Sequence, residues 1–200
     1  MSEKTSIVLT GVGGQGVITA ANILGKAAIA ANKEVFVSEV HGMAQRGGAV
    51  ICTVRIGAVS GPLVPKGMAD VIVSMEPIEA ARNIAYAHKN TKIITDINPI
   101  IPFTVSVGGE QYPDLKQVFT ELSKKTQLIK IDALTIAKEA GAVITRNIVM
   151  LGALAASNVL PIDKNTLLNT ILDNVPKKYQ TINKNAFIGG INAYKSYKKD

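Results

Sequence analysis

The sequence predicts an α/β fold, with a three-layer arrangement around a mostly parallel, Rossmann-like sheet, one antiparallel pair of strands and a helical C-terminal part. Segments rich in β-branched residues alternate with helical segments through the first two thirds of the chain. The composition is 47% apolar but only 4% aromatic, so the interior is expected to be aliphatic. Beyond Arg146 the pattern becomes helical, and for 200 residues we expect one domain over 1–200 with a helical portion from about 146 to 200.

The predicted strands are short runs dominated by Val, Ile and Thr between turn-forming residues. They lie at residues 5–10, 34–40, 49–56, 70–75, 91–96, 102–107 and 127–131. The strand at 49–56 follows its predecessor after a short glycine-rich loop, so we expect an antiparallel pair there. Helical segments separate several of the other strands, which favours parallel pairing.

The predicted helices carry recognisable starts and apolar faces. They lie at 16–31, 77–88, 114–125 and 147–157, with two more after Asp132 and Asp163, which are typical N-cap residues. The helix at 77–88 begins with a proline, which a first turn tolerates, and His88 would end it. Segment 147–157 is apolar nearly all round, so we expect it to be buried in the protein or against a partner.

The net charge of +7 is concentrated in residues 174–200, which contain six lysines and one acidic residue. A surface for nucleic acid and a solvated C-terminal helix both explain this pattern. We favour the solvated helix and predict no nucleic-acid partner. Charged residues make up only 18% of the chain, which suggests that part of the surface is covered in an assembly.

Cys52 is the only cysteine, and its place in a strand indicates a small buried side chain rather than a nucleophile. A single cysteine cannot form an intrachain disulfide or hold an iron–sulfur cluster, and the two histidines, His41 and His88, cannot form a multi-histidine metal site without carboxylate ligands. We therefore predict no metal in this chain. No apolar run approaches the roughly 20 residues that span a bilayer, and the N-terminus lacks an apolar signal core, so we expect a soluble, cytoplasmic protein without membrane contact.

A glycine-rich turn follows the first predicted strand and precedes the first predicted helix. Gly11, Gly13 and Gly16 fit the pattern G-x-G-x-x-G, Gly14 adds a fourth position without a side chain, and Gln15 projects from the turn. Such a turn presents backbone N–H groups at a helix N-terminus, where phosphates bind.

Three interpretations of this turn remain open. It could bind NAD or FAD, with Glu39 near the end of the second strand as the acid for the ribose hydroxyls. It could instead bind another phosphate or a backbone segment, or serve as a structural turn alone.

A second polar loop, "SEVHGMAQRGGAV" at 38–50, follows the second strand at the same expected edge of the sheet. Two glycine-framed loops at one edge favour a functional site, because ligands gather at the carboxyl ends of parallel strands. Its candidate residues are His41, Gln45, Arg46, Gly47 and Gly48.

Polar residues also end two later strands. Glu76 has two equally open interpretations, as a second polar wall of the site or as the N-cap of the next helix. Asp96 and Asn98 are predicted to form a turn, because Asn-Pro is a common turn former.

Several stretches resemble the small subunits of the 2-oxoacid:ferredoxin oxidoreductase superfamily, and the "HGMAQ" portion points to its indolepyruvate ferredoxin oxidoreductase branch. The stretches that carry the resemblance are "GVGGQGV", "SEVHGMAQRGGAV", "VRIG", "ADVIVSMEPIEAAR", "RNIVMLGALA" and "NKNAFIGGI". The resemblance implies a CoA-dependent oxidative decarboxylation of an arylpyruvate to an aryl-acetyl-CoA, carbon dioxide and reduced ferredoxin.

The resemblance also implies a division of labour between two chains. Thiamine diphosphate, Mg and the iron–sulfur clusters would belong to a large alpha subunit, in a heterotetramer with two copies of each subunit. This chain would be a non-redox partner, with no catalytic residue assigned, whose two glycine loops help to bind coenzyme A or cofactor. Arg46 suits that role because its planar guanidinium matches phosphate and carboxylate. The alternative is an independent NAD- or FAD-binding protein.

Overall fold

The computed structural model describes residues 4–41, 48–101 and 111–197, and of His41 only the backbone. Its described strands form one six-stranded sheet in the order β2-β3-β1-β4-β5-β6. The strands are β1 (Lys4–Val12), β2 (Val35–His41), β3 (Ala49–Gly57), β4 (Ala69–Ser74), β5 (Ala87–Asp96) and β6 (Gln127–Ile131). The predicted strand at 102–107 lies outside the described residues.

Strand directions confirm the mostly parallel sheet. β1, β4, β5 and β6 pair in parallel, as expected for strands joined through helices. β3 is the strand that does not follow the parallel arrangement, as the short loop before it predicts. It runs antiparallel to both of its neighbours, β1 and β2. β3 therefore separates β2 from β1, although β2 precedes it in the chain.

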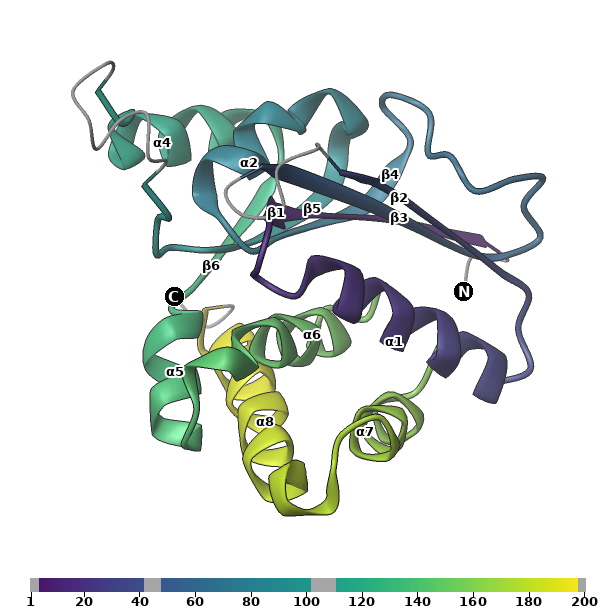
Figure 1. The fold of residues 1–200 in the computed structure, drawn as a ribbon. Coiled ribbons are helices and arrows are strands. Elements are labelled where there is room, and N and C mark those ends of the chain that lie inside the picture. Colours follow the sequence, from purple (N-terminus) through teal and green to yellow (C-terminus); the bar gives the residue numbers. More distant parts are fainter. Residues whose placement is uncertain (1–3, 42–47, 102–110, 198–200) are drawn as a thin grey trace.

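Helices cover both faces of the sheet and give the predicted three layers (Figure 1). On one face lie α2 (Pro77–Arg82) and α4 (Leu115–Lys125); on the other lie α1 (Val17–Ala30), α5 (Ala133–Ala140), α6 (Arg146–Ala156), α7 (Lys164–Asp173) and α8 (Gln180–Tyr197). The described residues also form three short 3-10 helices, η1 (Ile84–Tyr86), η2 (Val143–Thr145) and η3 (Lys177–Tyr179). Successive side chains of β1 point to opposite faces of the sheet, so this strand contributes to two hydrophobic clusters. Ile7 and Leu9 join the larger cluster, and Val8 joins the smaller one.

Acidic residues start several helices, as their sequence positions predict. Asp132 and Asp163 are confirmed as N-caps, since Asp132 accepts the N–H of Thr135 and Asp163 accepts those of Asn165 and Thr166. Glu76 is the N-cap of α2, where its carboxylate accepts the N–H of Glu79 at 2.9 Å. The buried position of Glu76 resolves its two interpretations in favour of the cap.

The predicted helix at 77–88 is too long. α2 ends at Arg82, and after η1 the chain enters β5 at Ala87, so His88 lies in a strand and does not end a helix. The cause is buried Asn83, whose amide donates to Thr10 Oγ1 at 3.0 Å and to the Glu79 carbonyl at 2.9 Å. The bond to Thr10 ties the end of α2 to β1, a contact that no local pattern contains.

α6 is enclosed, which confirms the expectation from its apolar sequence, and residues 147–156 are all buried. It crosses α8 at a pair of glycines. A Cβ on Gly152 would lie 2.1 Å from the carbonyl oxygen of Phe187, and a Cβ on Gly190 would lie 1.9 Å from that of Val149. The two helix backbones are therefore in direct contact.

Gly190→Ala should destabilise the protein by about 3 kcal/mol or more, because the added methyl group meets backbone that cannot move without separating α6 from α8. Gly61→Ala is the matched control, since a Cβ there has no neighbour within 4 Å, and it should change stability by less than about 0.5 kcal/mol. Thermal and denaturant unfolding measure both variants. Equal stability of the two would contradict the backbone contact.

Candidate functional site

The two glycine-framed loops meet at the carboxyl end of β1. Gly11 and Val12 pair with Val50 and Ala49 of β3, and the N–H of Gly13 donates to the carbonyl of Gly48 at 2.9 Å. The structure therefore brings the start of the second loop's return strand against the first glycine turn. Gln45, Arg46 and Gly47 lie outside the described residues, and the backbone of His41 pairs with Val50 as the last residue of β2.

The glycines of the turn serve different purposes. Gly14 and Gly16 have φ values of 97° and 77°, in the left-handed region where glycine carries no steric penalty. Gly11 lies in β1, where a Cβ would be 2.7 Å from Gln15 Oε1 and 2.9 Å from Val17 Cγ2. Gly11 therefore allows α1 to pack closely on β1, while Gly14 and Gly16 form the turn itself.

Gln15 does not project from the turn as the sequence suggests. Its side-chain oxygen accepts the N–H of Val12 at 2.7 Å, and its amide nitrogen donates to the carbonyl of Met75 at 2.6 Å. The amide thus joins the glycine turn to the end of β4. With both ends of the amide engaged, Gln15 supports the turn from within.

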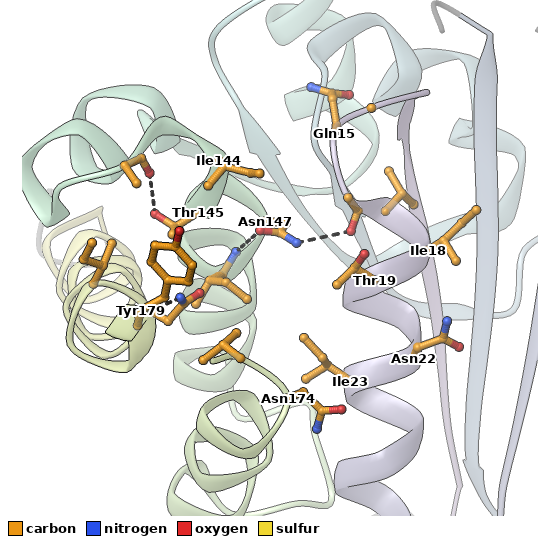
Figure 2. Close-up of a pocket in the computed structure, with 18 of the residues that line it drawn as sticks. Gln15, Ile18, Thr19, Asn22, Ile23, Ile144, Thr145, Asn147, Asn174 and Tyr179 are labelled. Atoms are coloured by element: carbon orange, nitrogen blue, oxygen red, sulfur yellow. Dashed lines mark hydrogen bonds between the residues drawn. The ribbon is translucent and has the colours of Figure 1, made fainter. Parts of the chain in front are cut away.

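A cavity of about 1270 Å³, which we call the α1 groove, opens beside this turn. One wall is formed by the glycine turn and α1, and the other by η2, α6 and the segment 174–183 (Figure 2). Figure 2 shows Thr19 and Ile23 of α1 across the opening from Asn147, Asn174 and Tyr179. The groove extends from the N-terminus of α1 to Lys26, about two and a half turns of that helix.

Polar groups line the groove from both walls. Thr19, Asn22 and Lys26 recur on α1 at spacings of three and four, so they share one face of the helix. The Lys26 ammonium donates to Oδ1 of Asn174 on the opposite wall. Sequence reasoning missed this stripe, although its spacing was a usable signal; its partner Asn174 comes from a distant part of the chain.

The N-terminus of α1 opens into the groove without a side-chain cap, because its N-cap residue is Gly16. Asn147 approaches Gly16 from α6, with Nδ2 at 3.4 Å from the Gly16 carbonyl oxygen. The first N–H groups of α1 are therefore directed toward a cavity at the positive end of the helix dipole.

A buried ion pair holds the wall that carries Asn147. Asp96, which is 1% exposed in its side chain, accepts the guanidinium of Arg146 at the start of α6. The same carboxylate accepts the N–H of Asn98 at 3.1 Å and that of Ala133 at 3.3 Å. Asp96 and Asn98 do form the predicted turn, and this turn also anchors α5 and α6.

Two buried carboxylates that follow β4, Glu76 and Glu79, have structural roles and do not line the groove. Burial raises the pKa of Glu79, and the hydrogen bond and charge of Arg82 oppose that shift. The hydroxyl of Tyr112 donates to Glu76, and burial together with that carboxylate raises the pKa of Tyr112. Neither carboxylate lines the α1 groove.

Cys52 is confirmed as a buried side chain. It is fully enclosed in β3, and burial, with a smaller contribution from the charge of Glu39, raises the pKa of its thiol to about 11. A thiol in that environment stays protonated at neutral pH and is a poor nucleophile.

The position of Glu39 disfavours dinucleotide binding. A ribose-binding acid lies on the strand beside the glycine-turn strand, but here β3 occupies that place. Glu39 is exposed on β2, two strands away from β1, which is about 10 Å in the plane of the sheet. The turn and the acid therefore do not form the pair that the NAD or FAD interpretation needs.

Within the described part of the chain, no group of three or more His, Cys, Asp and Glu side chains could hold a metal ion. The helices described there also include none that is long and apolar enough to cross a membrane.

Comparison with known proteins identifies the family. Residues 6–193 match the family model of pyruvate ferredoxin/flavodoxin oxidoreductases. The chain belongs to this family. Among its relatives is the indolepyruvate oxidoreductase subunit IorB of Pyrococcus horikoshii, 45% identical over 196 residues that cover 96% of this chain and 97% of that protein. The resemblance inferred from the sequence motifs is thus confirmed.

Solved structures of pyruvate ferredoxin/flavodoxin oxidoreductase relatives share the fold. The gamma subunit of a keto/oxoacid ferredoxin oxidoreductase from Geobacter sulfurreducens matches with a TM-score of 0.71 at 24% identity, covering 96% of this chain and 99% of that one. A 2-oxoglutarate:ferredoxin oxidoreductase from Magnetococcus marinus, with 2-oxoglutarate, coenzyme A and succinyl-CoA bound, matches with a TM-score of 0.75 at 24% identity. This match covers 98% of this chain and 32% of that one.

Gly16→Ala should destabilise the protein by about 2–3 kcal/mol. A Cβ at Gly16 adds backbone strain at a φ of 77° and would lie 2.6 Å from Asn147 Nδ2, so Asn147 must leave its place. Gly14→Ala is the control, since its φ of 97° is also strained but its Cβ would meet no atom within 4 Å, and it should cost about 1 kcal/mol. Unfolding curves compare the two, and a larger loss for Gly14→Ala would refute the role of Asn147.

Proposed function

We propose that this protein is the small, non-redox subunit of an indolepyruvate ferredoxin oxidoreductase. The enzyme would convert an arylpyruvate, coenzyme A and oxidised ferredoxin to an aryl-acetyl-CoA, carbon dioxide and reduced ferredoxin. Support comes from the family match over residues 6–193 and from relatives named indolepyruvate oxidoreductase subunit IorB at 45% and 44% identity. The proposed setting is the cytoplasm, in a complex with two copies of each subunit.

The redox chemistry is assigned to a larger alpha subunit because the one cysteine of this chain cannot hold an iron–sulfur cluster. The single cysteine is buried, and an iron–sulfur cluster needs several accessible thiolates. Thiamine diphosphate, Mg and the clusters are therefore proposed to reside on the alpha subunit, which would also pass electrons to ferredoxin. This chain would contribute binding surface to a site completed by its partner.

The α1 groove is the main observation that supports a role of this chain in coenzyme A binding. Coenzyme A is long, with phosphates at one end and an apolar, amide-containing arm at the other. The groove offers matching chemistry, with the uncapped N-terminus of α1 and the Lys26 ammonium for phosphates. Ile18, Ile23 and Tyr179 provide apolar wall, and Asn147 and Asn174 provide amides for hydrogen bonds.

The second loop extends this proposal beyond the groove. Gly48 bonds to Gly13 at the rim, so the segment that carries Arg46 begins and ends near the glycine turn. We propose that His41, Gln45, Arg46 and Gly47 face the large subunit there, with the guanidinium of Arg46 meeting an anionic group of coenzyme A or cofactor.

Purification of the untagged native complex tests the assignment. The chain should co-purify with a larger, brown subunit that contains thiamine and iron–sulfur clusters, and the chain alone should not reduce ferredoxin with indolepyruvate and coenzyme A. Catalysis by the isolated polypeptide would overturn the proposal. Saturable protection of the isolated chain by micromolar NAD would favour the independent dinucleotide-binding alternative instead.

Replacement of Lys26 or Arg46 by Ala tests the coenzyme A site within the complete complex. Each variant should raise the apparent KM for coenzyme A about tenfold with little change in kcat, since the lost contact is to a charged group that binds equally before and during reaction. Lys66→Ala is the control, because Lys66 is exposed on the loop between β3 and β4 and does not line the groove. Unchanged coenzyme A kinetics with an intact complex would show that the altered residue is not part of the coenzyme A site.

A further inference from the structure

β2 ends the sheet with an open edge. It is the outermost strand beside β3, and no strand of the described residues pairs with its other side. Its apolar side chains are exposed as well, with Phe36 at 41% and Val40 at 62% of their surface accessible. α2 packs over β1, β4 and β5, and α4 over β6, so the helices described on that face lie toward the other end of the sheet.

This edge has few of the features that usually prevent strand pairing, and Glu39 is the one acidic residue on it. Its seven residues, Val35–His41, contain no proline or lysine, and its pairing with β3 is in continuous register without a bulge. Exposed edge strands of monomeric proteins are commonly protected by such features, because the free N–H and C=O groups otherwise recruit another strand. A weakly protected apolar edge is suited to pairing with another strand.

The hydrogen-bonding direction of β2 follows from one bond at its start. The carbonyl of Glu34 accepts the N–H of Gly57 on β3 at 2.9 Å. In an antiparallel pair the two backbone groups of a residue point to the same side, and the side alternates along the strand. The even-numbered residues therefore bond to β3, and Val35, Val37, Glu39 and His41 direct their N–H and C=O groups outward.

We propose that β2 pairs antiparallel with β2 of a second copy of this chain, about a two-fold axis at Ser38, to form one continuous sheet across the two copies. Only this register pairs all seven residues of the strand with one another. It places outward-bonding residues opposite each other, Val35 with His41 and Val37 with Glu39. It also places Phe36 opposite Val40 twice on one face.

The charge of Glu39 and the small side chain of Ser38 both favour this register. Each Glu39 lies opposite Val37 of the second copy, whereas a register centred on Glu39 would bring two like charges face to face. Ser38 lies on the axis in a pair without hydrogen bonds, where opposing Cα atoms are about 4.5 Å apart and small side chains fit best. The sequence of β2 is thus complementary to itself, which favours a second copy over a strand of another protein. The pairing does not depend on coenzyme A or on the oxo acid.

Cysteine cross-linking of the full chain, alone and in its complex with the large subunit, tests the register. Ser38→Cys should give a disulfide-linked dimer of this chain under mild oxidation, since the separation on the axis suits a disulfide and the native Cys52 is enclosed. Val40→Cys is the matched control, because residue 40 is more exposed but the two copies of it lie about 13 Å apart along the strands. Mixing Phe36→Cys with Val40→Cys should restore the cross-link that neither gives alone.

A proline variant tests the edge without a new thiol. Glu39→Pro removes an outward N–H and leaves the bonds from β2 to β3 in place. The mass of the isolated chain in light scattering should therefore fall from twice 21.1 kDa to that of a single copy, while Glu39→Ala stays dimeric.

The proposal is overturned if Ser38→Cys cross-links no better than Val40→Cys, if it cross-links to the large subunit instead, or if Glu39→Pro keeps the mass of Glu39→Ala. None of these variants should alter the KM for coenzyme A, so this inference and the coenzyme A site can fail separately.

Discussion

The close approach of α1 to β1 at Gly11 determines the geometry of the rest of the site. There is no room for a side chain at that position, because a Cβ would lie 2.7 Å from Gln15 and 2.9 Å from Val17. The Gln15 amide then connects the turn to β1 and to the end of β4 at Met75. These contacts fix where α1 begins and in which direction it leaves the sheet. The N-terminus of α1 consequently opens into the groove rather than into the core.

The opposite wall of the groove depends on contacts far from the glycine turn. The buried pair between Asp96 and Arg146 holds the start of α6, and the crossing of Gly152 with Gly190 brings the backbone of α8 against it. Because protein interiors are close-packed, movement of either helix would be transmitted to Asn147 and to the segment near Asn174. Residues that never touch a ligand can therefore control the shape of the groove.

The proposed function and the proposed edge pairing assign different surfaces of one sheet to different tasks. The carboxyl ends of the parallel strands carry the glycine turn and the groove, where ligand binding in α/β proteins is expected. The edge strand β2 carries apolar residues and unpaired backbone groups, which suit association. Glu39, a polar residue of β2, is consequently explained as a surface residue of an interface rather than as a ribose-binding acid. Two copies joined at β2 would hold two grooves in a fixed relation within the proposed complex of two copies of each subunit.

The sequence by itself determined the features that depend on neighbouring residues. The alternation of strands and helices, the caps at Asp132 and Asp163 and the enclosure of α6 follow from local pattern, and the motifs identified the family. Only the tertiary structure decided which strand lies beside β1, that Gln15 turns inward, and that Asn83 ends α2 before His88. The same holds for the meeting of Lys26 with Asn174 across 148 positions of sequence. These outcomes depend on contacts between distant segments, whose partners are selected by packing and hydrogen bonding in the folded chain and leave no periodic signal in the sequence.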